Sequence, residues 1–215
     1  MSNNPIQLKV CGMRDPDNMI EVAALHPDYM GFIFYRNSKR AVPSNFQIPN
    51  NFPSGIKRVG VFVNESTSAI LKLVEKFSLD FVQLHGEESP RRCEDIRKAG
   101  VGVMKVFAIG ANFDFKTLQP FKKLVNYFLF DTKGAGYGGT GTVFDWRSLQ
   151  QYDQEVPFFL SGGLSPENIH DVATLRGMNL HALDVNSGVE VRPGLKDVEK
   201  IGKLQGRMQD LKFKI

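Results

Sequence analysis

Eight short apolar segments recur along this chain of 215 residues, and each is bounded by turn residues or charges. Continuous apolar runs of this length are typical of strands buried on both faces, as in a parallel sheet. The predicted strands are residues 7–11, 29–34, 59–63, 81–84, 101–107, 127–131, 158–161 and 182–185. The pattern predicts an α/β fold.

Segments with helical spacing lie between most of these strands, so strand and helix alternate along the chain. They cover residues 17–25, 66–77, 90–99, 166–174 and about 198–211. Three of them have a start signal, a capping side chain followed by proline: Asp15-Pro16, Ser89-Pro90 and Ser165-Pro166. The segments after the second, fifth and sixth strands have weaker patterns, which predict short or irregular helices.

Eight parallel strands with crossover helices can close into a barrel or remain an open, doubly wound sheet. The number eight favours closure. An open sheet often carries a G-x-G-x-x-G fingerprint after its first strand, whereas Gly12-Met13-Arg14-Asp15 follows here. No linker rich in Pro, Gly or Ser divides the chain. We therefore predict a single-domain (β/α)8 barrel, the TIM-barrel fold, over residues 1–215.

The composition argues against several classes of protein. No run approaches the roughly 20 apolar residues that span a bilayer, and the N-terminus has no apolar signal region. The cysteines Cys11 and Cys93 lack the spacing of a metal site and suit a reducing compartment. The 27 basic and 23 acidic residues give a net charge of +4, with the basic residues scattered. We expect a cytoplasmic protein without a metal and without a membrane or nucleic-acid partner.

The end of the sixth predicted strand is unusual, because the apolar run 128–130 leads directly to Asp131. Five glycines occur in the next ten residues, where they allow positive φ and a close approach of the backbone to a ligand. In a barrel, functional residues gather at the carboxyl ends of the strands. Other polar side chains at or after strand ends are Cys11, Arg40, His85 and Asp184.

Glycine turns follow the seventh and eighth predicted strands. Gly162-Gly163 and Ser187-Gly188 can each present backbone N–H groups to an oxyanion near a helix start. The loops after strands seven and eight of a barrel often bind phosphate. Either pair alone could simply make a tight turn, but the two together predict a phosphate site.

Each candidate side chain also has a structural interpretation. A free cysteine is more often an inert buried residue, although Lys9 and Arg14 near Cys11 could stabilise a thiolate that accepts a proton. Asp131 could cap a helix or pair with the lysine two residues further on. His85 could hold a loop instead of contacting a substrate. Opposite each other across a barrel, however, Cys11 and Asp131 would form an acid/base pair.

Seven motifs are most informative when they are taken together. They are KVCGMRD, GFIFYRNSKR, RVGVFVN, FVQLHGEE, FLFDTKGAGYGGTGTVFDW, FFLSGGLSPENI and ALDVNSGVEVRPGLKD, from Lys9 to about Asp197. This series resembles the phosphoribosylanthranilate isomerase family of tryptophan biosynthesis. The resemblance implies a (β/α)8 fold, no cofactor, and isomerisation of N-(5-phosphoribosyl)anthranilate to 1-(2-carboxyphenylamino)-1-deoxyribulose 5-phosphate.

The resemblance also implies roles for individual residues. By the family's motifs, Cys11 falls on the general base and Asp131 on the general acid. Arg40 falls on the position that holds the anthranilate carboxylate. The turns at 162–163 and 187–188 fall on the phosphate-binding loops.

The remaining expectations concern the substrate and partners. His85 and Asp184 are predicted to contact the substrate, Asp184 at the sugar hydroxyls. The protein is expected to bind a small phosphorylated molecule as a monomer or a homodimer. Two departures from the family pattern are small, Arg36-Asn37 in place of a frequent proline-lysine pair and Asn186 in place of a frequent serine.

Two other functions remain open at this point. A related isomerase of histidine biosynthesis performs the same rearrangement in the same kind of barrel, but that family pairs two aspartates, whereas Cys11 ends the first strand here. A non-catalytic barrel that binds phosphorylated ligands would need the phosphate loops and perhaps Arg40. It would need neither Cys11 nor Asp131.

Overall fold

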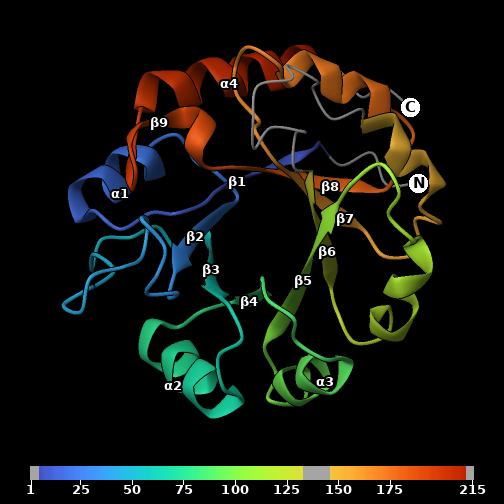
Figure 1. Ribbon diagram of the computed structural model, residues 1–215. Helices are drawn as coiled ribbons and strands as arrows, with labels where there is room; N and C mark the ends of the chain where they lie inside the picture. Colours follow the sequence, from blue (N-terminus) through green and yellow to red (C-terminus); the bar gives the residue numbers. More distant parts are fainter. Residues whose placement is uncertain (1–4, 133–145, 212–215) are drawn as a thin grey trace.

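Eight parallel strands close into a barrel in the computed structural model, which describes residues 5–132 and 146–211 (Figure 1). The strands are β1 (Gln7–Val10), β2 (Tyr29–Ile33), β3 (Lys57–Phe62), β4 (Phe81–Leu84), β5 (Gly102–Ile109), β6 (Tyr127–Thr132), β7 (Phe158–Ser161) and β8 (Leu180–Val185). Strand β8 pairs with β1 over four residues, from Gln7 with Ala182 to Val10 with Val185, and this pairing closes the sheet. The predicted (β/α)8 barrel is confirmed.

Four strands begin or end beyond the predicted apolar runs, among them β6, which ends at Thr132 rather than at Asp131. Strand β3 begins at Lys57 because that residue pairs with Tyr29 of β2, and β5 extends to Ile109 because that residue pairs with Thr132 of β6. Strand β8 begins at Leu180, which pairs with Phe158. Hydrogen bonding to a neighbouring strand therefore extends these strands past the residues that an apolar run identifies.

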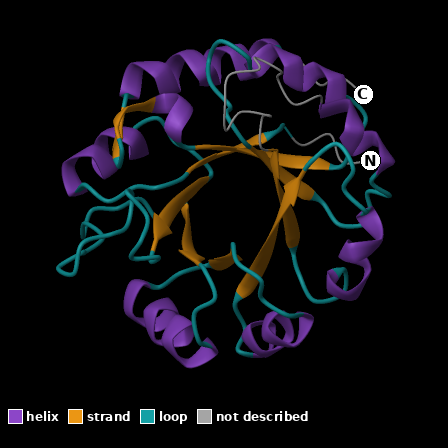
Figure 2. Cartoon of the chain, viewed as in Figure 1, coloured by secondary structure: helices purple, strands orange, loops and turns teal. Residues whose placement is uncertain are grey.

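Helices surround the ring of strands (Figure 2). The α-helices are α1 (Pro16–Ala23), α2 (Thr67–Phe77), α3 (Pro90–Lys98) and α4 (Val198–Asp210). The predicted caps at two of them are confirmed, since Asp15 accepts a hydrogen bond from the Asn18 N–H (3.0 Å) and Ser89 from the Arg92 N–H (3.4 Å). Helices α1 and α3 thus begin where the sequence indicates.

The third predicted start signal was wrong. In place of an α-helix over 166–174, a 3-10 helix, η3 (Ile169–Leu175), begins after a turn. The Asn168 side chain closes this turn, because its Oδ1 accepts from the Ser165 N–H (2.9 Å) and its Nδ2 donates to the Gly163 carbonyl (2.8 Å). An asparagine that bonds to nearby backbone competes with helix formation and delays the start.

The weaker crossovers have the predicted irregular character. Two 3-10 helices follow β5 and β6, η1 (Phe115–Phe121) and η2 (Trp146–Gln151), and the described segment 34–56 after β2 has turns but no helix. The glycine-rich segment that follows Asp131, predicted to approach a ligand closely, lies outside the described residues from position 133 onward.

A short hairpin after β8 was not predicted. The 3-10 helix η4 (Ser187–Val189) leads to β9 (Glu190–Arg192), which pairs in antiparallel fashion with β10 (Leu195–Lys196). The turn between them uses Gly194 at φ +82°, a conformation that favours glycine. Strands of two and three residues are too short to produce an alternating pattern in the sequence.

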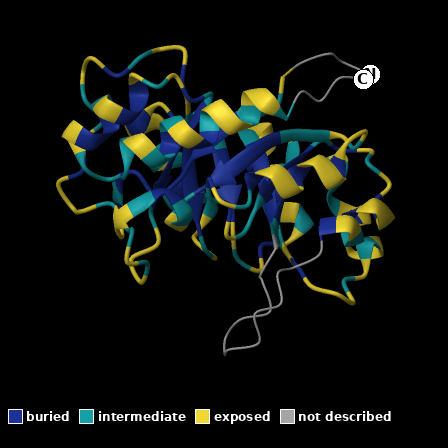
Figure 3. Cartoon of the chain, turned by 90° about the horizontal axis from the view of Figure 1, so that it is seen from above, coloured by how far each residue is buried: buried dark blue, intermediate teal, exposed yellow. Residues whose placement is uncertain are grey.

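The barrel interior has an apolar floor and a polar mouth. Alternate strand residues point inward and form a buried cluster: Tyr29, Val59, Met104, Val106, Leu129, Phe159 and Ala182. Nearer the carboxyl ends of the strands, Cys11, Ile33 and Val61 form a smaller cluster. The strands are buried beneath helices whose outer faces are exposed (Figure 3). Among the described residues, no helix has both the length and the apolar character needed to cross a membrane.

Candidate active site

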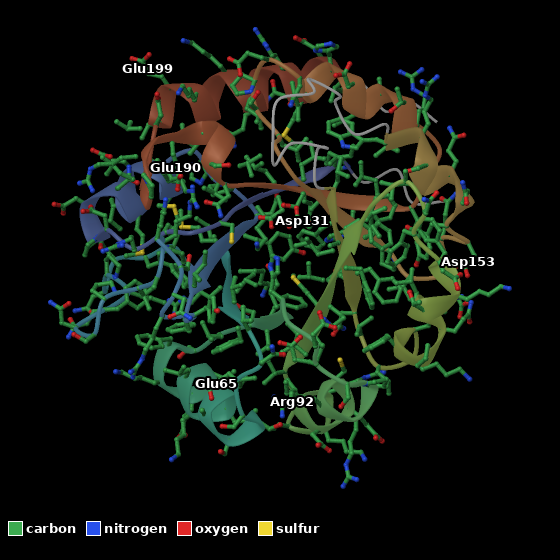
Figure 4. All side chains as sticks on the ribbon, in the orientation of Figure 1. Glu65, Arg92, Asp131, Asp153, Glu190 and Glu199 are labelled. Carbon is green, nitrogen blue, oxygen red and sulfur yellow. The ribbon has the colours of Figure 1, made fainter. Side chains whose placement is uncertain are left out.

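A cavity of roughly 210 Å³ opens at the carboxyl ends of the strands. Eight of the nine predicted site residues line it: Cys11, His85, Asp131, Gly162, Gly163, Asp184, Ser187 and Gly188. They come from the ends of β1, β4, β6, β7 and β8, so barrel closure brings together residues that are far apart in sequence. Figure 4 shows Asp131 near the centre of the barrel mouth.

Cys11 follows β1 and is only 4% exposed. Its N–H donates to the Val185 carbonyl (2.9 Å), which continues the pairing of β1 with β8 past the end of the strand. Gly31 of β2 lies against the thiol, since a Cβ placed at Gly31 would lie 2.7 Å from Cys11 Sγ. A residue without a side chain is therefore required beside the sulfur.

Gly31→Ala is expected to displace the thiol. The added methyl would also lie 3.1 Å from Cys11 Cα, so the backbone of one strand must shift as well. We expect a loss of about 1–3 kcal/mol in unfolding free energy and a changed rate of Cys11 alkylation. Thermal unfolding and mass-spectrometric alkylation kinetics measure the two effects. Gly202→Ala on α4 is the control, because no atom lies within 4 Å of the added methyl; equal behaviour of the two variants would contradict the prediction.

Lys9, two residues before Cys11 on the same inward face, is fully buried. Its Nζ donates to Asp184 Oδ1 at 2.8 Å. Burial opposes the charge on Lys9, but Asp184 and Cys11 raise its pKa above the ordinary value. Burial raises the pKa of the Cys11 thiol, and the Lys9 ammonium lowers it. An ammonium ion is thus fixed below the thiol.

The other cation predicted beside Cys11 does not line the cavity. Arg14 Nη1 donates to the Lys39 carbonyl (3.3 Å), and the Arg14 side chain lies over Gly194, where an added Cβ would be 2.3 Å from Arg14 Cδ. Arg14 instead lines a separate pocket with Arg192. Lys9 is the predicted cation that lowers the pKa of Cys11 against the effect of burial.

Asp131 and His85 approach each other across the cavity. His85 Nε2 lies 3.6 Å from Asp131 Oδ2, and the two side chains are 39% and 23% exposed. Gln83, buried two residues earlier on β4, places its Nε2 at 3.3 Å from His85 Nδ1. Because Gln83 Nε2 can only donate, this contact leaves the proton of a neutral His85 on Nε2, facing Asp131.

A buried ion pair outside the barrel holds the loop that carries His85. Lys105 Nζ donates to Glu88 Oε2 (3.1 Å) and to the Gly86 carbonyl (2.7 Å). Glu88 in turn accepts from the N–H groups of Gly86 (2.9 Å) and Asn64 (2.9 Å). The roles of Gln83, Glu88 and Lys105 were not predicted from the sequence. The polar residues at positions 83 and 85 share one strand face. This pattern could have indicated that Gln83 lies beside His85.

Arg40 is the one predicted site residue that does not line the cavity. It lies at the edge, where a Cβ at Gly12 would be 3.1 Å from Arg40 Cδ. Its guanidinium is paired with Glu190 of β9, whose position on the rim appears in Figure 4. Lys196 of β10 donates to the same carboxylate at 2.8 Å. The roles of Glu190 and Lys196 were not predicted, because both residues belong to the hairpin that the sequence pattern does not indicate.

The two predicted phosphate turns lie against each other. A Cβ at Gly188 would be 2.1 Å from the Leu164 carbonyl oxygen, so only glycine allows this approach. Gly162 and Gly163 have φ values of 107° and 68°. The glycines at these three positions are therefore required by close packing or by backbone conformation.

Comparison with known proteins identifies the family of this chain. The family model for N-(5'phosphoribosyl)anthranilate (PRA) isomerase matches residues 8–206. The chain belongs to this family. An N-(5'-phosphoribosyl)anthranilate isomerase from Parabacteroides distasonis is 44% identical over 197 residues, which cover 90% of this chain and 89% of the relative. The predicted function is confirmed: isomerisation of N-(5-phosphoribosyl)anthranilate to 1-(2-carboxyphenylamino)-1-deoxyribulose 5-phosphate in tryptophan biosynthesis.

Solved isomerases of the family have the same fold. One phosphoribosyl anthranilate isomerase, in complex with reduced 1-(o-carboxyphenylamino)-1-deoxyribulose 5-phosphate, is 30% identical with a TM-score of 0.80; the match covers 95% of this chain and 99% of that one. A structure of monomers obtained from the dimeric isomerase of Thermotoga maritima is 29% identical with a TM-score of 0.77, over 95% and 98% of the two chains.

Proposed function

We propose that this isomerase uses Cys11 as its general base and Asp131 as its general acid. The observation that carries the proposal is their position in one cavity, which the two glycine turns also line. A base and an acid are the two groups that an aldose-to-ketose rearrangement of an aminosugar requires. No group of three or more His, Cys, Asp or Glu in residues 5–132 and 146–211 could hold a metal ion.

Asp131 acts first, in the opening of the furanose ring. Its carboxylic acid protonates the ring oxygen while the amine nitrogen donates its lone pair to C1; the C1–O bond breaks, and a protonated Schiff base forms. His85 Nε2, 3.6 Å from the Asp131 carboxylate, lies where it can return a proton from solvent. Positioned acids of this kind contribute on the order of 10²–10⁴ in rate.

Cys11 then removes the proton from C2, which the cationic Schiff base has made acidic. The electrons of the C2–H bond form the C1–C2 double bond of an enolamine, and those of the C=N bond move to nitrogen. Tautomerisation of the enolamine gives the amino ketone. The Lys9 ammonium below the thiol stabilises the thiolate that this step needs.

Lys9→Met is expected to raise the pKa of Cys11 and so to lower the fraction of thiolate at neutral pH. Because Lys9 opposes the effect of burial, its loss raises the pKa of Cys11 further. The acidic limb of kcat/KM and the pH midpoint of Cys11 alkylation should both move to higher pH, with lower reactivity at neutral pH. Mass spectrometry distinguishes Cys11 from Cys93. An unchanged midpoint would remove Lys9 from the mechanism, while Lys203→Met, a change on the surface helix α4, should leave the midpoint unchanged.

The other predicted residues bind the substrate. The glycine turns at 162–163 and 187–188 would hold the phosphate, Arg40 the anthranilate carboxylate, and His85 and Asp184 the sugar. Asp184 also accepts from Lys9, so one of its oxygens is already committed to the ion pair. The relative with a bound reduced product supports a phosphorylated substrate.

The proposal extends to the organisation of the whole protein. Residues 1–215 would form one domain that acts as a monomer or a homodimer, and the dimeric relative from Thermotoga maritima supports the second state. A cytoplasmic location would suit a biosynthetic enzyme with unpaired cysteines at positions 11 and 93.

The direct test is a fluorescence assay with freshly generated phosphoribosylanthranilate. We expect the purified protein to consume the anthranilate-type fluorescence rapidly. Binding of the reduced product without turnover would favour a non-catalytic barrel. Faster turnover of the aminosugar phosphate of histidine biosynthesis would favour that pathway's isomerase.

A further inference from the structure

Three charged side chains beside the cavity form a network, and the function proposed above assigns a role to only one of them, Arg40. Arg40 comes from the loop after β2, Glu190 from β9 and Lys196 from β10. Arg40 Nη2 lies 2.7 Å from Glu190 Oε2, and Lys196 Nζ lies 2.8 Å from Glu190 Oε1. The Glu190 and Lys196 side chains are 5% and 0% exposed, whereas the Arg40 side chain is 24% exposed. The network is therefore closed toward the hairpin and open at Arg40.

The contacts of Arg40 use one side of its guanidinium. Nε donates to Glu190 Oε1 (2.9 Å) and Oε2 (3.0 Å), and Nη2 donates to Oε2. A guanidinium can grip a carboxylate with two edges, the Nε–Nη2 side or the Nη1–Nη2 end. Glu190 occupies the side edge. Within the described part of the chain, the end edge remains free for a second carboxylate.

Lys196 determines the charge that such a carboxylate meets. Arg40 and Glu190 alone would be neutral as a pair, and the buried Lys196 restores a formal charge of +1 to the group of three. Burial by itself would raise the pKa of Glu190, but hydrogen bonds from Arg40, Lys196 and the Gly194 N–H hold it below its ordinary value. The glutamate is thus an anion that orients the arginine without cancelling the positive charge of the network.

The network also reaches the cavity lining. Lys196 Nζ donates to Asn186 Oδ1 at 2.7 Å, and Asn186 lines the cavity. A Cβ at Gly12, directly after Cys11, would lie 2.8 Å from Asn186 Oδ1 and 3.1 Å from Arg40 Cδ. The network is therefore in contact with Asn186 of the cavity lining and with Gly12, the residue that follows Cys11.

We propose that Glu190 and Lys196 are positioning residues that present the end edge of Arg40 to the carboxylate of the substrate's aromatic ring, and that they thereby select carboxylated arylamines. This inference rests on the proposed function, in which Arg40 binds that carboxylate. The hairpin β9–β10 then has a role, because it carries the two residues that hold the arginine.

The test compares two substrates that differ only in this carboxylate, N-(5-phosphoribosyl)anthranilate and N-(5-phosphoribosyl)aniline. Glu190→Gln should raise KM for the first substrate by about 10- to 100-fold, the range for a hydrogen bond to a charged group, with little change in kcat. Lys196→Met should raise the same KM. For the aniline substrate, kcat/KM should change by less than about threefold. Glu94→Gln, which removes an exposed ion pair on α3, should leave KM and kcat unchanged for both substrates.

The direction in which Glu190→Gln changes KM distinguishes a role of Glu190 in orienting Arg40 from a purely electrostatic role. Removal of the anion makes the network more positive, so a purely electrostatic role predicts a lower KM for the carboxylated substrate, whereas loss of orientation predicts a higher one. A lower KM, or an equal loss with both substrates, would overturn the inference, the second result because it indicates a role in folding alone.

Failure of the proposed function gives a different result. In that case the wild-type protein converts neither substrate, and calorimetric binding of the reduced product with and without its carboxylate tests the network directly. A carboxylate preference that Glu190→Gln removes would support the positioning role even in a protein that only binds. No carboxylate preference in the wild type would overturn it.

Discussion

Cys11→Ala should lower kcat by about 10²- to 10⁴-fold, the range for loss of a positioned general base, and leave binding of the reduced product nearly unchanged. Alanine is smaller than cysteine and cannot accept a proton, whereas the phosphate turns and Arg40 are untouched by the change. Stopped-flow loss of substrate fluorescence measures kcat, and calorimetry measures the affinity for the reduced product.

The second cysteine provides a matched control. Cys93 is fully buried on α3, outside the barrel, and burial raises its pKa to about 11. Cys93→Ala removes the same atom from a similar degree of burial and should retain wild-type kcat. If Cys11→Ala keeps full turnover, Cys11 has the structural role of an inert buried residue, and another base must be found.

The barrel could be predicted from sequence because its strands are buried on both faces. Eight apolar runs with intervening helical segments are compatible with few arrangements of strands. Cys11, His85 and Asp131 at the strand ends are not the side chains expected in an apolar core, so they indicate a functional site. Barrel closure then brings these ends to one rim. The catalytic candidates were found because a polar residue after an apolar run is a local signal.

Residues that act through another side chain had no such signal. Glu190 and Lys196 are charged and would be assigned to the surface, yet the hairpin buries both against Arg40. Glu88 is similarly buried only because Lys105 of a neighbouring strand reaches it. Whether a charged side chain is buried depends on where its partner lies in the fold. Neither the periodicity nor the spacing of residues in the sequence gives that position.

The same limit explains the error at η3. Ser165-Pro166 is a valid local signal for a helix start, but the Asn168 side chain bonds to Ser165 and Gly163 instead, and the helix begins later. The turn that results carries Gly162 and Gly163 into the cavity. Two local preferences compete there, and the Ser165-Pro166 start signal reflects only one of them.

Asp131→Asn should also lower kcat by about 10²- to 10⁴-fold, because asparagine keeps the shape of the carboxyl group but cannot protonate the ring oxygen. The reduced product has no ring to open, so its affinity should change little. Loss of the acid should therefore appear in kcat, measured by the same fluorescence assay, and not in calorimetric binding.

Two further variants locate the effect. Asp153→Asn, at an exposed aspartate paired with Lys122 far from the cavity, should retain wild-type kcat. His85→Asn should reduce kcat less than Asp131→Asn does, because His85 lies 3.6 Å from the carboxylate and returns the proton rather than delivering it to the sugar. The reverse order, with His85→Asn the more damaging change, would make His85 the acid that opens the ring and Asp131 the residue that orients it.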